Sequence, residues 1–220
     1  MKAMILAAGR GERMRPLTDQ TPKPLLEAGG KPLIVHHIER LRSAGYEELV
    51  INTHHLGAQV IEALGDGSHW GVRIQYSPES PIALETAGGI GHALPLLGND
   101  VFLVINGDVW CDHDLTSVSL DSNSVAHLVL VPNPEHNPRG DFDLNKHQLT
   151  NNKRYTFSGI GWYRPELFKG YGDAPAPLAP LLREAIDAGR VNGEVHCGEW
   201  MDIGTPERLQ QLDQLLQIDN

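Results

Sequence analysis

Apolar positions along the chain follow two alternating patterns, and together they predict strands separated by helices. Short apolar runs rich in β-branched residues indicate buried strands, and alternation of apolar and polar residues indicates a half-buried one. The predicted strands are 4–6, 49–51, 72–76 and 101–105. Apolar residues at helical spacing predict helices at 33–41, 58–64 and 87–97. This order predicts an α/β fold with a doubly wound, mostly parallel, Rossmann-like sheet.

The pattern changes after residue 124. Strands predicted at 125–131, 142–144 and 155–157 follow one another without helices between them, so we expect a small antiparallel excursion from the sheet. Helices are predicted at 177–188 and 206–216. No repeat, low-complexity tract or linker interrupts these elements, and we expect a single domain over residues 1–220.

Composition and charge narrow the class of protein. A length of 220 residues is enough for one α/β domain with a well-buried core. The net charge of −10 argues against nucleic-acid binding, which needs a basic face. An acidic protein that binds anionic substrates must therefore concentrate its basic groups locally, and residues 10–23 do so.

Cysteine content and hydropathy bear on the compartment. Cys111 and Cys197 are too few for a disulfide framework, so we expect free thiols in a reducing compartment. The apolar stretch before Gly9 is too short for a signal peptide, and no run approaches membrane-spanning length. We therefore expect a cytoplasmic protein without a membrane partner.

Basic residues and glycines gather directly after the first predicted strand. Gly9 and Gly11 lack a Cβ, so successive backbone N–H groups there can form a concave nest for an anion. Arg13 and Lys23 add positive charge, and Arg15 is a secondary candidate. The stretch predicts a grip for a polyphosphate; the alternative is a surface turn with incidental arginines.

Two better-known phosphate loops do not fit this stretch. A Walker loop ends in Gly-Lys-Ser/Thr, which the segment lacks. A dinucleotide-binding loop has a third glycine where Met14 stands here, and an acidic residue where Asn52 stands. A dinucleotide-dependent oxidoreductase is therefore disfavoured.

The segment Leu6-Ala-Ala-Gly-x-Gly-x-Arg-Met-x-Pro-Leu-Thr18, followed by Lys23-Pro24, resembles the signature of the sugar-1-phosphate nucleotidylyltransferases. Further matching stretches follow in the family's order at 85–90, 106–108, 157–160 and 200–206. Within the family, stretches 84–90, 106–110, 139–142 and 178–183 are similar to the short N-acetylmuramate-1-phosphate uridylyltransferases of cell-wall recycling.

The resemblance implies a Mg²⁺-dependent enzyme that transfers a uridylyl group from UTP to a sugar 1-phosphate, with N-acetylmuramate 1-phosphate as the first expectation. It implies catalytic roles for Arg13, Lys23 and Asp108, and a Mg²⁺ site on Asp108 and Asp202. Read from the residues alone, each aspartate could instead be a turn residue or a helix cap, and Thr205 before Pro206 is itself a good N-cap.

The resemblance also assigns substrate contacts. The implied nucleotide-binding residues are Ala8, Gly9, Gly11, Glu12, Arg13, Lys23, Glu79, Glu85, Thr86 and Gly88. The implied sugar-binding residues are Asn106, Gly140, Asp141 and Gly159. Two simpler explanations stay open, namely a helix start capped by Thr86 and ordinary loop polarity. Arg139 is a candidate partner for the lactyl carboxylate of muramic acid, or a surface loop residue.

Histidine is plentiful but does not form a recognisable site. The adjacent pairs His36-His37 and His54-His55 lack the spacing of a helical zinc site, so we expect structural or loop roles. His54 follows a strand and could reach the nucleotide.

Rival functions remain at this point. Within the family they are glucose-1-phosphate thymidylyl- or uridylyltransferase and mannose-1-phosphate guanylyltransferase. Outside it, a catalytically silent nucleotide-sensing domain is possible, although Arg13, Lys23, Asp108 and Asp202 are all present. The expected partners are small-molecule substrates, with no nucleic acid or membrane, and the expected assembly is a monomer or a small homo-oligomer.

Overall fold

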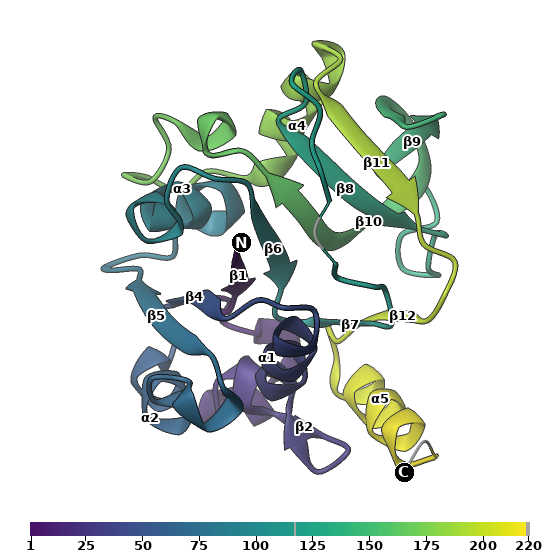
Figure 1. The fold of residues 1–220 in the computed structure, drawn as a ribbon. Coiled ribbons are helices and arrows are strands. Elements are labelled where there is room, and N and C mark those ends of the chain that lie inside the picture. Colours follow the sequence, from purple (N-terminus) through teal and green to yellow (C-terminus); the bar gives the residue numbers. More distant parts are fainter. Residues whose placement is uncertain (117, 219–220) are drawn as a thin grey trace.

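A mixed sheet crosses the molecule in this computed structural model, which describes residues 1–116 and 118–218 (Figure 1). Its strand order is β11-β8-β10-β6-β1-β4-β5, with β9 paired to β10. The parallel half consists of β1 (Lys2–Leu6), β4 (Glu48–Thr53), β5 (Arg73–Pro78) and β6 (Phe102–Asn106). The predicted α/β fold with a mainly parallel central sheet is confirmed.

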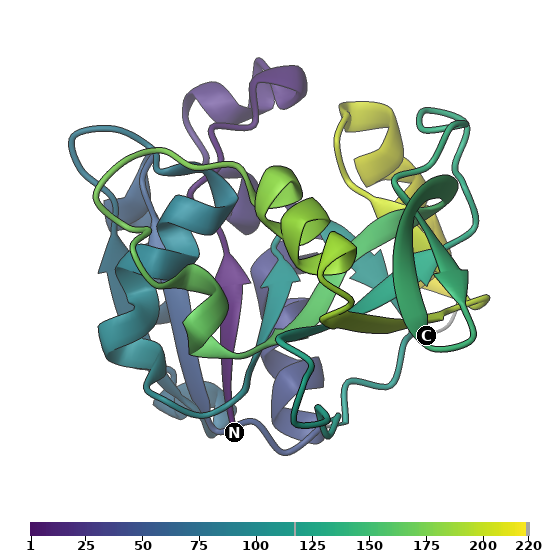
Figure 2. The same ribbon diagram turned by 90° about the horizontal axis from the view of Figure 1, so that it is seen from above.

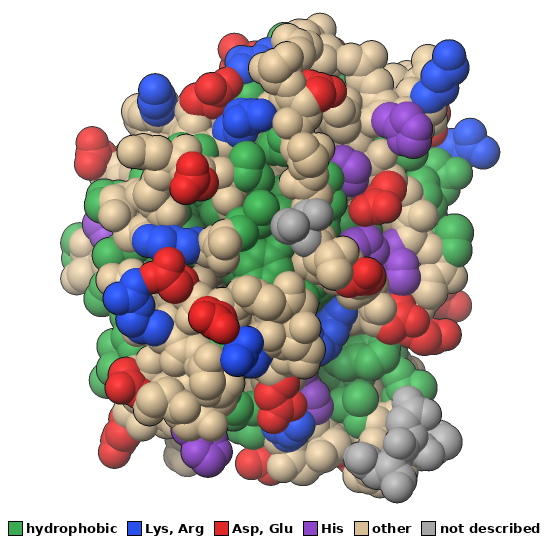
Figure 3. All heavy atoms as spheres, viewed as in Figure 1, with side chains coloured by type: hydrophobic (Ala, Val, Ile, Leu, Met, Phe, Trp, Pro, Cys, Tyr) green, Lys and Arg blue, Asp and Glu red, His purple; other side chains and the backbone are tan. Residues whose placement is uncertain are grey.

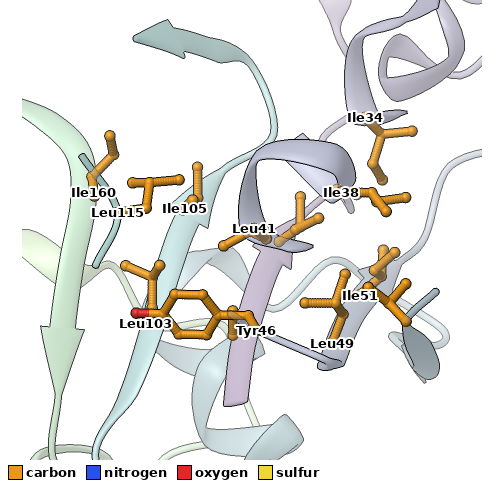
Figure 4. Packing of buried hydrophobic residues seen from close by; sticks show 14 of the residues in the cluster. Ile34, Ile38, Leu41, Tyr46, Leu49, Ile51, Leu103, Ile105, Leu115 and Ile160 are labelled. Atoms are coloured by element: carbon orange, nitrogen blue, oxygen red, sulfur yellow. The ribbon is translucent and has the colours of Figure 1, made fainter. Parts of the chain in front are cut away.

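Helices cover both faces of the sheet (Figures 1 and 2). The four that pack on it are α1 (Leu33–Ser43), α2 (Gly57–Leu64), α3 (Glu85–Leu97) and α4 (Leu178–Asp187). Side chains alternate between the faces, so Ile5 packs in the cluster with α1 and α2 whereas Met4 packs in the cluster with α3 and α4. Figure 4 shows Ile38 and Leu41 of α1 packed in the first cluster with Ile51 and Leu103.

The other half of the sheet is mostly antiparallel. It comprises β8 (Ala126–Val131), β9 (Phe142–Asn145), β10 (Gln148–Tyr163) and β11 (Val191–Val195). β10 runs antiparallel to β6, β8 and β9, and it thereby joins the two halves. The predicted excursion is confirmed, but the predicted strand 155–157 is part of a strand of 16 residues, and β11 escaped prediction.

A small separate sheet pairs β7 (Val109–Cys111) with β12 (Trp200–Asp202) in antiparallel register. The chain then ends in α5 (Pro206–Ile218), which packs on the hairpin of β2 (Glu27–Ala28) and β3 (Lys31–Pro32). A third hydrophobic cluster joins these parts; it comprises Met14, Leu26, Ala28, Leu33, Ile203 and Leu212. The loop after β1 is therefore anchored to the carboxyl-terminal segment.

Short 3-10 helices complete the description: η1 (Glu12–Met14), η2 (Leu17–Asp19), η3 (Lys23–Leu25), η4 (Ser68–Trp70) and η5 (Pro165–Phe168). Within the described ranges, no helix is long and apolar enough to cross a membrane. On the face shown in Figure 3, acidic and basic side chains are interspersed, as expected for a protein that does not use that face to bind a polyanion.

Candidate active site

Two adjoining cavities open at the carboxyl ends of the central strands, where open α/β sheets bind their ligands. The first has a volume of about 270 Å³, and its lining includes Ala8, Gly9, Lys23, Glu79 and Asp108. The second has a volume of about 480 Å³, and its lining includes Asp141, Phe142, Phe157, Leu182 and Arg183. Both are lined by Glu85, Thr86 and Asn106, so the two cavities meet at these residues.

An ion pair lies in the first cavity. Lys23, in η3, is only 8% exposed, and its Nζ donates to Asp108 Oδ2 at 2.6 Å. Gly11 gives the loop room for this lysine, because a Cβ there would lie 3.2 Å from Lys23 Cβ and 2.9 Å from Thr18 Cγ2. The pair brings a cation and a carboxylate together at the end of β6, 85 residues apart in sequence.

Buried hydrogen bonds form the floor of the same cavity. Asn52 Oδ1 accepts the N–H of Ala7 at 2.7 Å, and Asn52 Nδ2 donates to Glu79 Oε1 at 2.7 Å. The second oxygen of Glu79 accepts the N–H of Leu84 at 2.7 Å. Both Asn52 and Glu79 are buried, and Gly89 must lack a side chain because a Cβ there would lie 2.5 Å from Glu79 Oε1. The network fixes the loop that leads into α3 against β1 and β4.

Asp202 lies next to Asp108 through the pairing of β7 with β12. Asp202 stands opposite Val109, and the N–H of Ile203 donates to Asp108 O at 2.6 Å. The carboxylate of Asp202 is paired with Arg208 of α5 and lies 3.1 Å from His136 Nε2.

The Arg13 guanidinium lies beside Gly204, close to the carboxylate of Asp202. A Cβ at Gly204 would come within 3.1 Å of Arg13 Nη2 and 3.0 Å of Asp202 Oδ2. Three distant segments therefore meet near Gly204 and Asp108. They contribute Arg13 and Lys23, Asp108, and Asp202.

The two aspartates have the donor chemistry for a hard divalent cation, because carboxylate oxygens are the ligands that Mg²⁺ prefers. Each is neutralised by a neighbouring cation, Asp108 by Lys23 and Asp202 by Arg208. A divalent ion would compete with these two cations for the carboxylates. In the described part of the chain, one cluster of three possible ligands has donor atoms within 4.8 Å of one another, namely Cys111, Asp112 and His196. It lies at the opposite end of β7.

The second cavity is lined by apolar side chains, two carboxylates (Glu85 and Asp141) and the guanidinium of Arg183. Asp141 Oδ2 accepts the N–H of Phe157 at 2.9 Å, and Asn137 Nδ2 donates to both oxygens of Asp141 at 3.2 Å. The remaining wall includes Phe142, Leu178 and Leu182. This cavity therefore offers a half-buried acceptor beside surfaces suited to methyl groups.

Comparison with known proteins identifies the family. A family model described as nucleotidyl transferase matches residues 2–142. The chain belongs to the nucleotidyl transferase family. As a member it is an enzyme, and the predicted family is confirmed.

The chain is 54% identical to the N-acetylmuramate alpha-1-phosphate uridylyltransferase of Neisseria meningitidis serogroup B, over 98% of both chains. It is 36% identical to the protein of that name from Caulobacter vibrioides, over 93% of this chain and 92% of the relative. A Bacillus anthracis structure provisionally named a glucose-1-phosphate thymidylyltransferase superposes with a TM-score of 0.87 at 24% identity, covering 100% of this chain and 96% of that one. This last likeness shows the fold alone.

The predicted site residues of this nucleotidyl transferase fall into two groups. Those that line the cavities are Ala8, Gly9, Lys23, Glu79, Glu85, Thr86, Asn106, Asp108 and Asp141. The others are not among the described residues that line either cavity: Gly11, Glu12, Arg13, Gly88, Gly140, Gly159 and Asp202. Some of this second group shape the site indirectly: Gly159, at φ 85°, leaves room for Asn106, whose Nδ2 would lie 2.7 Å from a Cβ there.

The structure bears on two residues of stretch 85–90, and it contradicts the alternative that Thr86 caps the helix. The space in front of Gly88 is filled by the protein itself, because a Cβ there would lie 2.7 Å from Ala174 O. Thr86 does not cap α3, since the capping position is Leu84 and no side chain caps it. Glu85 begins the helix at φ 58°, a left-handed conformation that is rare outside glycine and worth noting at a cavity wall.

The histidine pairs have structural contacts. Burial lowers the pKa of His37 to about 4, helped by the positive charge of Arg40. His36 Nε2 contacts Ala28 O at 2.9 Å, and His54 Nδ1 contacts Glu79 O at 2.9 Å. His54 therefore supports the loop that carries Glu79, and it is not among the described residues that line the first cavity.

Several residues of the site escaped the sequence analysis: Asn52, His136, Arg183 and Arg208. Arg139, the candidate for a carboxylate partner, is exposed and lies outside the lining of both cavities among the described residues. The match to family stretch 178–183 was a signal for Arg183, but its charge alone did not distinguish it from a solvent-exposed helix residue.

Proposed function

We propose that this enzyme transfers a uridylyl group from UTP to the phosphate of N-acetylmuramate 1-phosphate, with release of pyrophosphate. The observation that carries the proposal is the pair of adjoining cavities. The chain is also 54% identical, over 98% of its length, to a relative named for that activity. The first cavity would take the nucleotide and the second the sugar. The use of UTP is consistent with a cytoplasmic enzyme, and the product would serve peptidoglycan recycling.

The reaction is an in-line displacement at the α-phosphorus of UTP. An oxygen of the sugar phosphate forms the new bond, and the bond from the α-phosphorus to the bridging oxygen of pyrophosphate breaks. No protein nucleophile is required, so the protein contributes position and charge. Lys23 contacts the α-phosphate and the incoming phosphate, and Arg13 contacts the β- and γ-phosphates that depart.

Asp108 and Asp202 would hold Mg²⁺, which when bound offsets the negative charge of the phosphates. The backbone at Ala8 and Gly9 approaches the polyphosphate, as the Gly9 position is exposed with open space around it. Glu85 and Thr86 face the nucleoside, and Asn106 lies between the two substrates because both cavities include it.

The remaining assignments act through these residues. Gly11 makes room for Lys23, Glu79 holds the loop before α3, and Gly159 makes room for Asn106. Asp141 is the acceptor for a sugar hydroxyl or amide N–H, and Gly140 shapes the turn before it. Glu12 and Gly88 act on the nucleotide side only through the loop and the helix that carry them, because neither lines a cavity among the described residues.

The proposal is tested by measuring pyrophosphate release with Mg²⁺ across UTP, dTTP, GTP, CTP and ATP. The acceptors are the 1-phosphates of N-acetylmuramate, N-acetylglucosamine, glucose and mannose. We expect selective turnover with UTP and N-acetylmuramate 1-phosphate, lost in Asp108→Asn. Turnover confined to another pair would replace the substrates, and folded protein that binds UTP without turnover of any acceptor would indicate a sensing domain.

A further inference from the structure

The second cavity contains a single cation among its described lining residues, Arg183 of α4. Two carboxylates, Glu85 and Asp141, share the lining. An acceptor that carries a carboxylate of its own would meet two negative charges here, and Arg183 is the group that could offset them.

Three contacts hold the Arg183 guanidinium in place. Its Nη1 donates to Asn151 Oδ1 at 3.2 Å, and its Nη2 donates to Asp141 O at 3.3 Å. Its Cζ lies 5.0 Å from the centre of the Phe142 ring, a cation–π distance. Asn151 is itself braced, because its Nδ2 donates to Asp187 Oδ1 at 2.7 Å and to Arg183 O at 3.1 Å.

These contacts leave donors free. Asn151 and Asp141 accept through neutral oxygens, and no ion-pair partner of Arg183 is found within residues 1–116 and 118–218. Arg208 and Arg190, in contrast, are each paired with a carboxylate. A guanidinium that is oriented but not neutralised is suited to a planar anion, because its remaining N–H groups can bind both oxygens of a carboxylate.

The phosphate of the acceptor is the less suitable anion for Arg183. It must lie beside Lys23 for the transfer, and Lys23 belongs to the first cavity. Arg183 lines only the second, beside Phe157 and Leu182. These apolar neighbours suit a group that joins a methyl to a carboxylate, which is the composition of the lactyl ether that distinguishes muramic acid from glucosamine.

We propose that Arg183 binds the lactyl carboxylate of N-acetylmuramate 1-phosphate and thereby selects this acceptor over sugar 1-phosphates that lack a carboxylate. The proposal rests on the proposed function. Arg183 acts on binding of the acceptor and not on the transfer step, so its removal raises KM more than it lowers kcat.

A cycle of two proteins and two acceptors tests this. Wild type and Arg183→Met are assayed with N-acetylmuramate 1-phosphate and with its lactyl carboxamide, which keeps the shape and removes the charge. We expect Arg183→Met to lower kcat/KM for the carboxylate by about 10- to 100-fold, the range for a charged hydrogen-bonded pair. We expect less than about a threefold change for the carboxamide, and partial recovery in Arg183→Lys.

Arg154→Met is the matched control, because Arg154 also lies over an aromatic ring, Tyr155 at 5.3 Å, but is largely exposed. It should leave the preference for the carboxylate unchanged. Arg139→Met tests the rival cation of the neighbouring loop. A selective loss in Arg139→Met would overturn the proposal, and so would equal losses on both acceptors in folded Arg183→Met. Failure of the proposed function would look different, since wild type itself would then ignore N-acetylmuramate 1-phosphate.

Discussion

The two cavities share Glu85, Thr86 and Asn106 but are built from different halves of the sheet. In the first, strands β1, β4 and β6 end side by side, and buried polar groups such as Asn52 and Glu79 bond to one another and to backbone. In the second, β9, β10 and α4 contribute side chains directly, and a mostly apolar wall holds two carboxylates and, among the described lining residues, one cation.

This difference indicates that the two cavities have different functions, one in phosphate binding and one in sugar selection. Parallel strands that end together expose backbone groups, which suit phosphates common to every nucleoside triphosphate. An antiparallel excursion presents side chains, which can change without disturbing the parallel half. In the proposed function, the transfer takes place in the first cavity and the second cavity selects the sugar.

The largest expected effect comes from removing the Lys23–Asp108 pair. Lys23→Met and Asp108→Asn should each lower kcat by about 10³-fold or more, because each removes charge stabilisation at the phosphates. The loss should be equal for all acceptors, as measured by pyrophosphate release. Lys31→Met is the matched control, since Lys31 also pairs with a carboxylate, that of Glu39, on the surface. A loss of kcat that differs between acceptor sugars would contradict the proposal that the first cavity carries out transfer and the second selects the sugar.

Glu79→Gln tests the buried network while conserving shape. The amide group would present a donor to the N–H of Leu84 or to Asn52 Nδ2, so one buried hydrogen bond is lost. We expect the free energy of unfolding to fall by about 1–3 kcal/mol, measured by urea denaturation, and KM for UTP to rise. The same change at exposed Glu62 should do neither. Unchanged stability in Glu79→Gln would mean that the loop is held by other contacts.

Acid should lower the free energy of unfolding through His37, which lies in α1 against the parallel half of the sheet. Burial lowers its folded-state pKa to about 4 from 6.5, so the unfolded chain binds the proton more readily at intermediate pH. The stabilisation is full above pH 6.5 and is lost as the pH falls toward 4; between pH 7 and pH 5 the loss is about 2 kcal/mol. His37→Leu should flatten the pH dependence of unfolding.

His127→Leu provides the comparison in the mostly antiparallel half of the sheet, because His127 lies in β8. Burial also lowers the pKa of His127, but the neighbouring Glu194 acts in the opposite direction. His127→Leu should therefore flatten the pH dependence less than His37→Leu does. The reverse order would show that the carboxylate does not compensate for burial in the antiparallel half.

The smallest expected effect is that of Phe142→Leu on the selectivity of the second cavity. The substitution removes the ring beneath Arg183, and a partly exposed cation–π contact contributes about 0.5–1 kcal/mol. The ratio of kcat/KM for N-acetylmuramate 1-phosphate to that for its lactyl carboxamide should fall by about two- to fivefold. Phe168→Leu, in the same hydrophobic cluster but packed on Phe102 and Tyr163, should leave the ratio unchanged.

The parallel half of the fold was predictable because burial on both faces leaves a clear signal. β1, β4 and β6 are apolar runs, and the helices between them carry apolar residues at regular spacing. β11 left no such signal, since Gly193 interrupts it; its missing Cβ avoids a contact of 2.5 Å with Leu128 O. The first half of β10 contains exposed polar residues such as Lys153 and Arg154, which lie where the register between β10 and β9 shifts, so no regular alternation marks this part of the strand.

Contiguous parts of the site were predictable, whereas parts made by tertiary contact were not. Gly9 and Lys23 stand in one recognisable segment. The role of Asn52 depends on Glu79, 27 residues later, and the orientation of Arg183 depends on Asn151, 32 residues earlier. Nothing in the local pattern around either residue records such a contact. The proximity of Asp202 to Asp108 likewise required the pairing of β12 with β7.

A crystal structure with Mg²⁺ and the product, UDP-N-acetylmuramate, would test the assignment of the two cavities most directly. The account predicts uridine in the first cavity, the diphosphate beside Lys23 and Asp108, and the sugar in the second cavity with its lactyl carboxylate on Arg183. A sugar bound outside the second cavity, or a diphosphate remote from Lys23, would contradict it.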